Sequence, residues 1–228
     1  MADIGTELME RLQSKVSFTI PIGHGIPIPY SVVVTWGIMA VLMILTLVFV
    51  RNLKMVPKGP QIYIEYIVGG LNNFVTGIMG EEGKRYAPYL GTVVIYLVCA
   101  NLIGIVGITP PTKDLNTTVA LALMSIVLIE YSGIHARGAK KWLKAFSEPM
   151  LFIAPINILE LFIRPLSLSM RLFGNILGGF VVMELIKILV PLFIPIPFSF
   201  YFDIFDGLIQ AYIFVFLTAL FMNEKIEA

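Results

Sequence analysis

The run from Val32 to Val50 contains no charged residue, and apart from two threonines and one glycine its side chains are apolar. About 20 apolar residues in a helix are enough to cross the hydrocarbon core of a bilayer, which is about 30 Å thick. Within that core every backbone N–H and C=O group must be paired inside the protein, so only helices and closed barrels span it. The run therefore predicts a transmembrane helix.

The composition places the whole chain in the same class. Of its 228 residues, 57% are hydrophobic and 14% are charged, and the mean hydropathy is +0.88. Soluble domains carry about 25% charged residues, so we expect an all-α integral membrane protein. The net charge of +1 argues against a nucleic-acid partner. The one cysteine, Cys99, excludes an internal disulfide and a cysteine-based metal site.

Four further apolar segments complete a predicted membrane domain. The predicted spans are residues 32–50, 88–108, 116–134, 153–190 and 199–222. Residues 61–80 place apolar side chains at helical spacing, with polar residues elsewhere on the wheel, which predicts an amphipathic helix on the membrane surface. We expect an N-terminal segment, 1–30, and a membrane domain, 31–228, with about five crossings.

The segment 153–190 is too long to stand upright in a bilayer. As one helix its 38 residues would extend about 57 Å, against about 30 Å of hydrocarbon. It must therefore incline steeply, lie nearly flat against protein, or break, and Pro165, Gly174, Gly178 and Gly179 are candidate bends. We expect a steeply tilted helix that forms a hairpin with the final helix.

The basic residues predict the orientation. Five lysines and arginines lie between the first two predicted spans and four follow the third, whereas the turn at 109–115 has one and the hairpin at 191–198 has none. Basic loops remain on the cytoplasmic side. The pattern predicts that the N-terminal segment is extracytoplasmic and that the C-terminus is cytoplasmic.

Arg171 lies in this otherwise apolar setting, within residues 166–175. An arginine keeps its charge at any ordinary pH, and holding that charge at membrane depth costs several kcal/mol or more. A residue retained at that cost predicts an oppositely charged partner inside the bilayer. Steps of three or four residues place it on one helical stripe of polar and small residues: Glu160, Arg164, Ser167, Arg171, Asn175 and Gly178.

The last predicted helix carries a second ionisable face, because Asp203, Asp206 and Gln210 follow at positions i, i+3 and i+7. A carboxylate in a poorly solvated site has a raised pKa, and a nearby arginine lowers it. When a moving carboxylate comes within reach of an arginine, the carboxylate therefore releases its proton. This is the physics of an ion-translocating stator. Other charges have plainer interpretations. Arg164 fits a snorkelling residue, Glu184 and Lys187 fit a local pair, and Glu130 fits a residue facing headgroups.

Several motifs resemble one known family. The run Pro165-Leu-Ser-Leu-Ser-Met-Arg-Leu-Phe-Gly-Asn175 resembles the signature of subunit a of the F-type rotary ATP synthase, and Gln210-Ala-Tyr-Ile-Phe214 resembles the signature of that family's last helix. Asn101-Leu-Ile-Gly104 and Pro111-Thr-Lys-Asp-Leu-Asn-Thr-Thr118 are similar to the end of its second span and the following turn. The motifs occur in the family's order, and the resemblance covers residues 85–228.

The resemblance implies a stator beside a rotating ring of c subunits. Arg171 matches the family's essential arginine, which faces the ring carboxylate and prevents leakage between two half-channels. Ser167, Asn175 and Gln210 match polar positions lining that region. Glu160 resembles the carboxylate of the inner access path. Asp203 would belong to the outer half-channel, where relatives carry His or Glu.

The chain departs from the family's pattern at one position. Phe180 lies nine residues after Arg171, where some members carry Glu. Asp203 would then serve the outer path as a single carboxylate. The participation of Glu130, Glu184 and Asp206 stays open at this point.

We therefore expect an ion-conducting stator subunit a that passes H⁺ or Na⁺ to and from the c ring. No Walker pattern is present, so we expect no catalysis by this chain itself, and no cofactor or metal. Its expected partners are the c ring, peripheral-stalk b subunits, the soluble catalytic head reached through them, and the lipid bilayer, in a bacterial plasma membrane. Two alternatives are a secondary transporter, with Arg171 binding an anionic substrate, and a passive assembly subunit of a respiratory complex.

Overall fold

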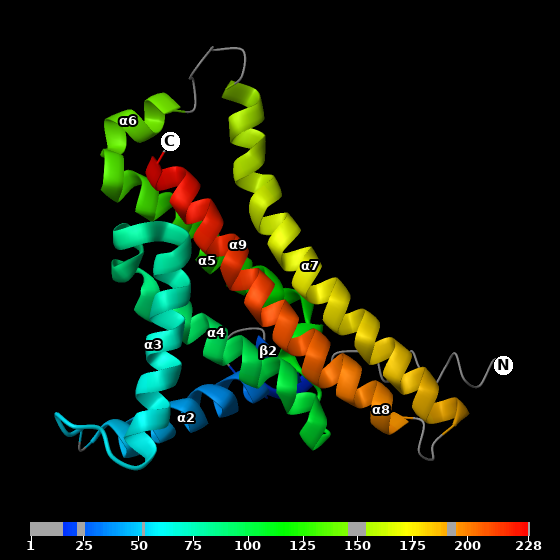
Figure 1. The fold of residues 1–228 in the computed structure, drawn as a ribbon. Coiled ribbons are helices and arrows are strands. Elements are labelled where there is room, and N and C mark those ends of the chain that lie inside the picture. Colours follow the sequence, from blue (N-terminus) through cyan, green and yellow to red (C-terminus); the bar gives the residue numbers. More distant parts are fainter. Residues whose placement is uncertain (1–15, 22–25, 52, 146–153, 191–194, 228) are drawn as a thin grey trace. The chain divides into compact units, whose positions relative to one another are not determined.

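Helices make up most of the described chain (Figure 1). The computed structural model describes residues 16–21, 26–51, 53–145, 154–190 and 195–227. Five of its helical segments are long and apolar enough to cross a membrane: Tyr30–Val50, Ala87–Val106, Leu115–Arg137, Ala154–Leu189 and Pro195–Glu227. The predicted fold class, an all-α membrane protein with about five crossings, is confirmed.

A short β-hairpin precedes the first long helix. Strand β1 (Val16–Ile20) pairs antiparallel with β2 (Ile26–Pro29). Proline is tolerated in edge strands, and a two-stranded hairpin has only edges, so Pro27 and Pro29 fit the pairing. The sequence pattern did not indicate these strands. The helix that residues 3–15 suggested lies outside the described residues.

The remaining elements follow in chain order. They are α2 (Tyr30–Val50), α3 (Pro60–Met79), η1 (Gly80–Arg85), α4 (Ala87–Leu102), η2 (Ile103–Val106), η3 (Pro111–Lys113), α5 (Leu115–Arg137), α6 (Ala139–Ala145), α7 (Ala154–Leu189), α8 (Pro195–Ser199), the π-helical η5 (Phe200–Asp206) and α9 (Gly207–Glu227). Local chemistry sets several of their ends. Pro60 starts α3, where its missing N–H costs nothing. Gly138, at φ 82°, lets the chain turn from α5 into α6.

The chain forms two compact units. The first comprises residues 1–51, 95–118 and 172–211, and the second comprises residues 52–94, 119–171 and 212–228. Their boundaries fall within α4, α5, α7 and α9, so these units differ from the division at residue 30 that the sequence suggested. That division stays a prediction.

In the first unit, two hydrogen bonds connect α2 to neighbouring elements. Its only buried described residues are Ser31 and Ile38. The Ser31 hydroxyl donates to Asp114 Oδ2 at 2.6 Å, and Thr35 shares a hydrogen bond with Tyr96. The exposed apolar remainder of α2 has the composition of a surface that faces lipid.

In the second unit, α3 buries one face and exposes the other, as an amphipathic helix does. Val75 and Met79 are buried, whereas Tyr63 and Tyr66 are exposed. The ring of Phe74 contacts the ring of Tyr212 on α9, with 5.2 Å between centroids. The core of this unit also contains Leu90, Ile129, Leu168, Phe214 and Met222.

Helix α7 is unbroken over 36 residues (Figure 1), a length of about 54 Å. It continues through Pro165, so of the three alternatives for this over-long segment, a break at a proline or glycine does not occur. Gly179 packs closely against η5, because a Cβ there would lie 3.2 Å from the Phe202 ring. At Gly178 a Cβ would meet nothing within 4 Å. Among the described residues, the α7 glycine that permits close packing is therefore Gly179.

Candidate functional site

A cavity of about 740 Å³ lies in the first unit. The start of α2, the end of α4, the turn around η3, the second half of α7, and η5 all contribute to its wall. Its polar and charged lining residues include Ser31, Asn101, Lys113, Asp114, Asn175, Glu184, Lys187, Asp203 and Asp206. Four carboxylates around one cavity are unusual in a chain with this little charge, and such intramembrane groups mark ion pathways.

Asp203 reaches the cavity from a π-helical segment. The Ser199 hydroxyl donates to Asp203 Oδ2, and Gly104 leaves room for the carboxylate, because a Cβ at Gly104 would lie 3.1 Å from Asp203 Oδ1. π-Helical turns occur frequently at functional sites. The wider turn also changes the predicted helical face: Asp203 and Asp206 line the cavity, but Gln210 does not.

Asp206 is half-buried beside the same cavity. It makes no hydrogen bond or ion pair with any residue that the structure describes. A carboxylate without a partner is costly where water is scarce. Asp206 is therefore as strong a candidate for ion contact as Asp203, which the sequence favoured.

Asn175 connects the cavity to Gln210. Its Nδ2 donates to Gln210 Oε1 at 2.6 Å. The Gln210 side chain is buried, and its Nε2 has no hydrogen-bond partner among the described residues. A buried N–H left unpaired costs about 1–3 kcal/mol, so this position favours a polar partner. The two residues, predicted as members of separate helix faces, thus form one polar contact.

Asn101 attaches the end of η5 to α4. Its Nδ2 donates to the Gly207 carbonyl at 2.9 Å, and its Oδ1 accepts from the Thr112 hydroxyl at 2.9 Å. All three residues are buried. The role of Asn101 was not predicted, although it belongs to one of the motifs that carry the family resemblance.

Two lysines also reach the cavity. Lys187 pairs with the buried Glu184 at 3.0 Å, which confirms the predicted local pair. Lys113 Nζ lies 3.8 Å from the centre of the Phe180 ring, a cation–π contact. At Phe180, the position where the chain departs from the pattern that the resemblance suggested, an aromatic ring thus lies beside a lysine. The contribution of Lys113 was not anticipated.

Arg171 is exposed on α7 and makes no hydrogen bond or ion pair within the described part of the chain. Ser167, one turn earlier, is exposed as well, and so is Asn175, one turn later. A charge at membrane depth requires compensation, and the described residues do not provide it for Arg171.

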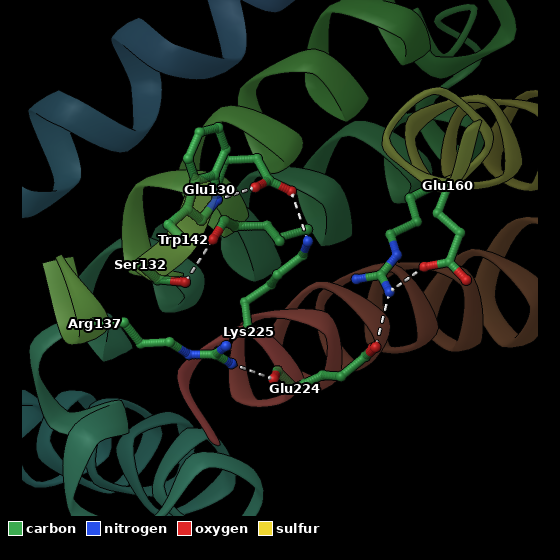
Figure 2. Close-up of polar contacts among 9 residues, drawn as sticks. Glu130, Ser132, Arg137, Trp142, Glu160, Glu224 and Lys225 are labelled. Atoms are coloured by element: carbon green, nitrogen blue, oxygen red, sulfur yellow. Dashed lines mark hydrogen bonds and ion pairs between the residues drawn. The ribbon is translucent and has the colours of Figure 1, made fainter. Parts of the chain in front are cut away.

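The second unit contains a separate charged cluster (Figure 2). The Arg164 guanidinium donates to Glu160 at 3.0 Å and to Glu224 at 2.9 Å, and its side chain is only 11% exposed. The snorkelling interpretation of Arg164 is therefore wrong. Glu130 accepts from Trp142 Nε1 at 2.7 Å and pairs with Lys225 at 3.5 Å. Because Glu130 packs against α6 and α9, the expectation that it faces headgroups is also wrong.

Comparisons with known proteins agree with these observations. The family model described as ATP synthase A chain matches residues 32–223. ATP synthase subunit a 2 of Bradyrhizobium sp. is 38% identical over 88% of this chain and 90% of its own length. ATP synthase subunit a of Moorella thermoacetica is 35% identical over 91% of this chain and 96% of its own length. The ATP synthase subunit a of Propionigenium modestum that is described as sodium ion specific is 32% identical over 89% of this chain and 76% of its own length.

The family model covers most of the chain, and the relatives match nearly all of it. The resemblance carried by the motifs around Arg171 and Gln210 is thereby confirmed. The relatives are bacterial, and the apolar helices place the protein in a membrane. The chain belongs to the ATP synthase A chain family, the membrane subunit a of ATP synthase.

Proposed function

We propose that this subunit passes H⁺ or Na⁺ to and from a ring of c subunits through two half-channels, with Arg171 between them. The observation that carries the proposal is the exposed Arg171 side chain, unpaired within the described residues. A carboxylate on a neighbouring subunit would provide the missing negative charge.

The cavity of the first unit supports an outer half-channel. Its wall contains Ser31 at the start of α2, the turn around Lys113, and Asp203. The distribution of basic residues supports an outer position for these segments. From the cavity, Asn175 and its partner Gln210 would carry the ion toward the ring. Glu184 and Asp206, which also line the cavity, belong to the same proposed path.

Glu160 supports an inner half-channel. It is exposed on α7 and pairs with Arg164. Ser167, also exposed, lies between it and Arg171 in the chain. Glu130, held by Trp142 and Lys225, would stabilise this end of the protein rather than conduct the ion.

The electrostatics of Arg171 separate the two paths. A fixed positive charge about 4 Å from a ring carboxylate favours the ionised form by about 4 kcal/mol at an effective dielectric constant of 20. That energy corresponds to about three units of pKa. A ring carboxylate would release its ion on reaching Arg171 and bind another after passing it, so an ion would cross only by rotation of the ring.

The subunit would act within a larger assembly of subunits. Peripheral-stalk b subunits would hold this chain against the ring and connect it to a soluble head that carries out the chemistry of ATP. The subunit itself would be non-catalytic, in a bacterial plasma membrane, with its N-terminus outside and its C-terminus cytoplasmic.

The test is ATP-driven ion uptake into inverted membrane vesicles, with and without added Na⁺. We expect Arg171→Ala to abolish uptake in an assembled complex. Arg51→Ala, which removes an exposed arginine just after α2, serves as the matched control and should retain uptake. Dependence on Na⁺ would identify the coupling ion. Normal uptake by Arg171→Ala would contradict the proposal and favour a passive assembly subunit.

A further inference from the structure

Glu224, near the end of α9, is a carboxylate to which neither the motifs nor the proposed paths assign a role. Its Oε1 accepts from the Arg164 guanidinium at 2.9 Å, and 55% of its side chain is exposed. Glu160 accepts from the same guanidinium nitrogen at 3.0 Å and is 52% exposed. Figure 2 draws Glu160 and Glu224 with dashed lines for these two contacts.

Arg164 is fixed in place between them. Its guanidinium lies 4.9 Å from the centre of the Phe221 ring, and only 11% of its side chain is exposed. Its Nη1 is buried without a hydrogen-bond partner among the described residues. One buried cation thus holds two carboxylates that remain open to solvent, and the three side chains together carry one net negative charge.

The other charged groups near Glu224 engage different atoms. Arg137, on α5, donates to the backbone carbonyl of Glu224 at 3.2 Å and to that of Ile226 at 3.4 Å. Lys225, the next residue in the chain, pairs with Glu130 at 3.5 Å. The backbone at the end of α9 is therefore anchored while the Glu224 carboxylate is directed toward Arg164 and Glu160.

We propose that Glu224 is a second carboxylate of the inner ion path. Together with Glu160 it attracts the translocated cation to the inner mouth, and Arg164 is the positioning residue that holds the pair together. This inference rests on the proposed function. It extends that function by assigning a residue on α9 to the inner path.

The physical reason is the local charge. Arg164 pairs with Glu160 on its own helix and with Glu224 on α9. One carboxylate would be enough to neutralise Arg164. The second carboxylate makes the site negative, and both are half-exposed. Removing one negative charge about 4 Å from a cation in a water-filled mouth lowers the occupancy of that cation about fivefold.

The test uses the assembled complex in inverted vesicles, where the medium bathes the inner mouth. ATP-driven uptake is measured over a series of pH values for H⁺ coupling, or of Na⁺ concentrations for Na⁺ coupling. We expect Glu224→Gln to raise the half-saturating ion concentration about fivefold and to retain the maximal rate. Glu224→Asp, which keeps the charge, should retain the wild-type value.

Glu227→Gln is the matched control. Glu227 is also exposed at the end of α9, so its removal reports the general effect of surface charge. Arg164→Lys keeps the positive charge without the planar fork. In that background Glu224→Gln should shift the half-saturating concentration by less than it does in wild type, as expected if Arg164 positions the carboxylate.

An unchanged half-saturating concentration in Glu224→Gln would overturn the inference, and so would an equal shift in Glu227→Gln. If Glu224→Gln does not assemble, Glu224→Ser is measured, with the same expected shift and the same contradicting result. If Arg171→Ala loses uptake while Glu224→Gln keeps the wild-type half-saturating concentration, the proposed function stands and this extension of it is contradicted. Normal uptake in Arg171→Ala would contradict both the proposed function and its extension to Glu224.

Discussion

The side-chain amide of Asn175 donates to the side-chain carbonyl of Gln210 at 2.6 Å, which joins α7 to α9 within the first unit. Asn175 lines the cavity, and Gln210 is buried behind it. The contact thus provides a polar connection from the cavity into the helix pair.

Substitution of either partner tests this connection. We expect Asn175→Leu and Gln210→Leu each to slow ion uptake, because each removes one side of a single polar contact. The double variant should be no slower than the slower single variant, with a coupling energy of about 0.5 kcal/mol or more. A double-mutant cycle on uptake rates measures it, and fully additive effects would show that the two residues act independently.

Asp203→Asn should slow translocation without preventing assembly. The amide keeps an oxygen that can accept from Ser199, so the π-helical segment has no reason to unfold. Loss of one proton-exchanging group while Asp206 remains predicts a reduction of about a hundredfold or less. The measurement is uptake over a range of pH, and an unchanged profile would remove Asp203 from the path.

Asp114→Ala should destabilise the first unit. Asp114 Oδ1 accepts from the backbone N–H of Asn116, which caps α5, and Oδ2 accepts from Ser31. Loss of the cap costs about 1 kcal/mol, and loss of the second hydrogen bond costs about another 1 kcal/mol. Thermal unfolding in detergent should show Ser31→Ala losing roughly half as much. Equal losses in the two variants would mean that the cap contributes nothing.

Gly179→Ala and Gly178→Ala should act in opposite directions. A Cβ at Gly179 would press on the Phe202 ring at 3.2 Å, and such overpacking costs about 1–3 kcal/mol. A Cβ at Gly178 meets nothing within 4 Å, and replacing a helical glycine by alanine gains up to about 1 kcal/mol. Unfolding of the isolated subunit in detergent checks both signs. Stabilisation by Gly179→Ala would contradict the packing described for α7 and η5.

The spans were predictable because apolarity alone determines which segments can lie in a bilayer. The prominence of Arg171 followed from the same argument, since only a charge in an apolar run is conspicuous. The local pair of Glu184 and Lys187 was also predictable, because residues three apart on a helix are neighbours. Each of these features depends on residues that are close in sequence.

The features that were missed depend on contacts between distant segments. Arg164 and Glu224 are far apart in the chain, and so are Asn101 and Gly207, whose contact joins α4 to the end of η5. Glu130 was expected to face headgroups, because its partner Trp142 belongs to the next helix, whose position is set by the turn at Gly138. No local pattern could have revealed these pairs.

The π-helical segment Phe200–Asp206 changes the meaning of residue numbers along the last helix. In an α-helix, seven residues bring a side chain back almost to the direction from which it started. Through a wider turn the same seven residues end at another direction, so Asp203 and Gln210 do not line the same cavity. The wider turn therefore shifts the side-chain directions of the residues after it by a fraction of a turn. Counting back seven residues from the glutamine of a relative therefore finds only the matching sequence position. The direction of the side chain at that position depends on whether the relative also has the wider turn.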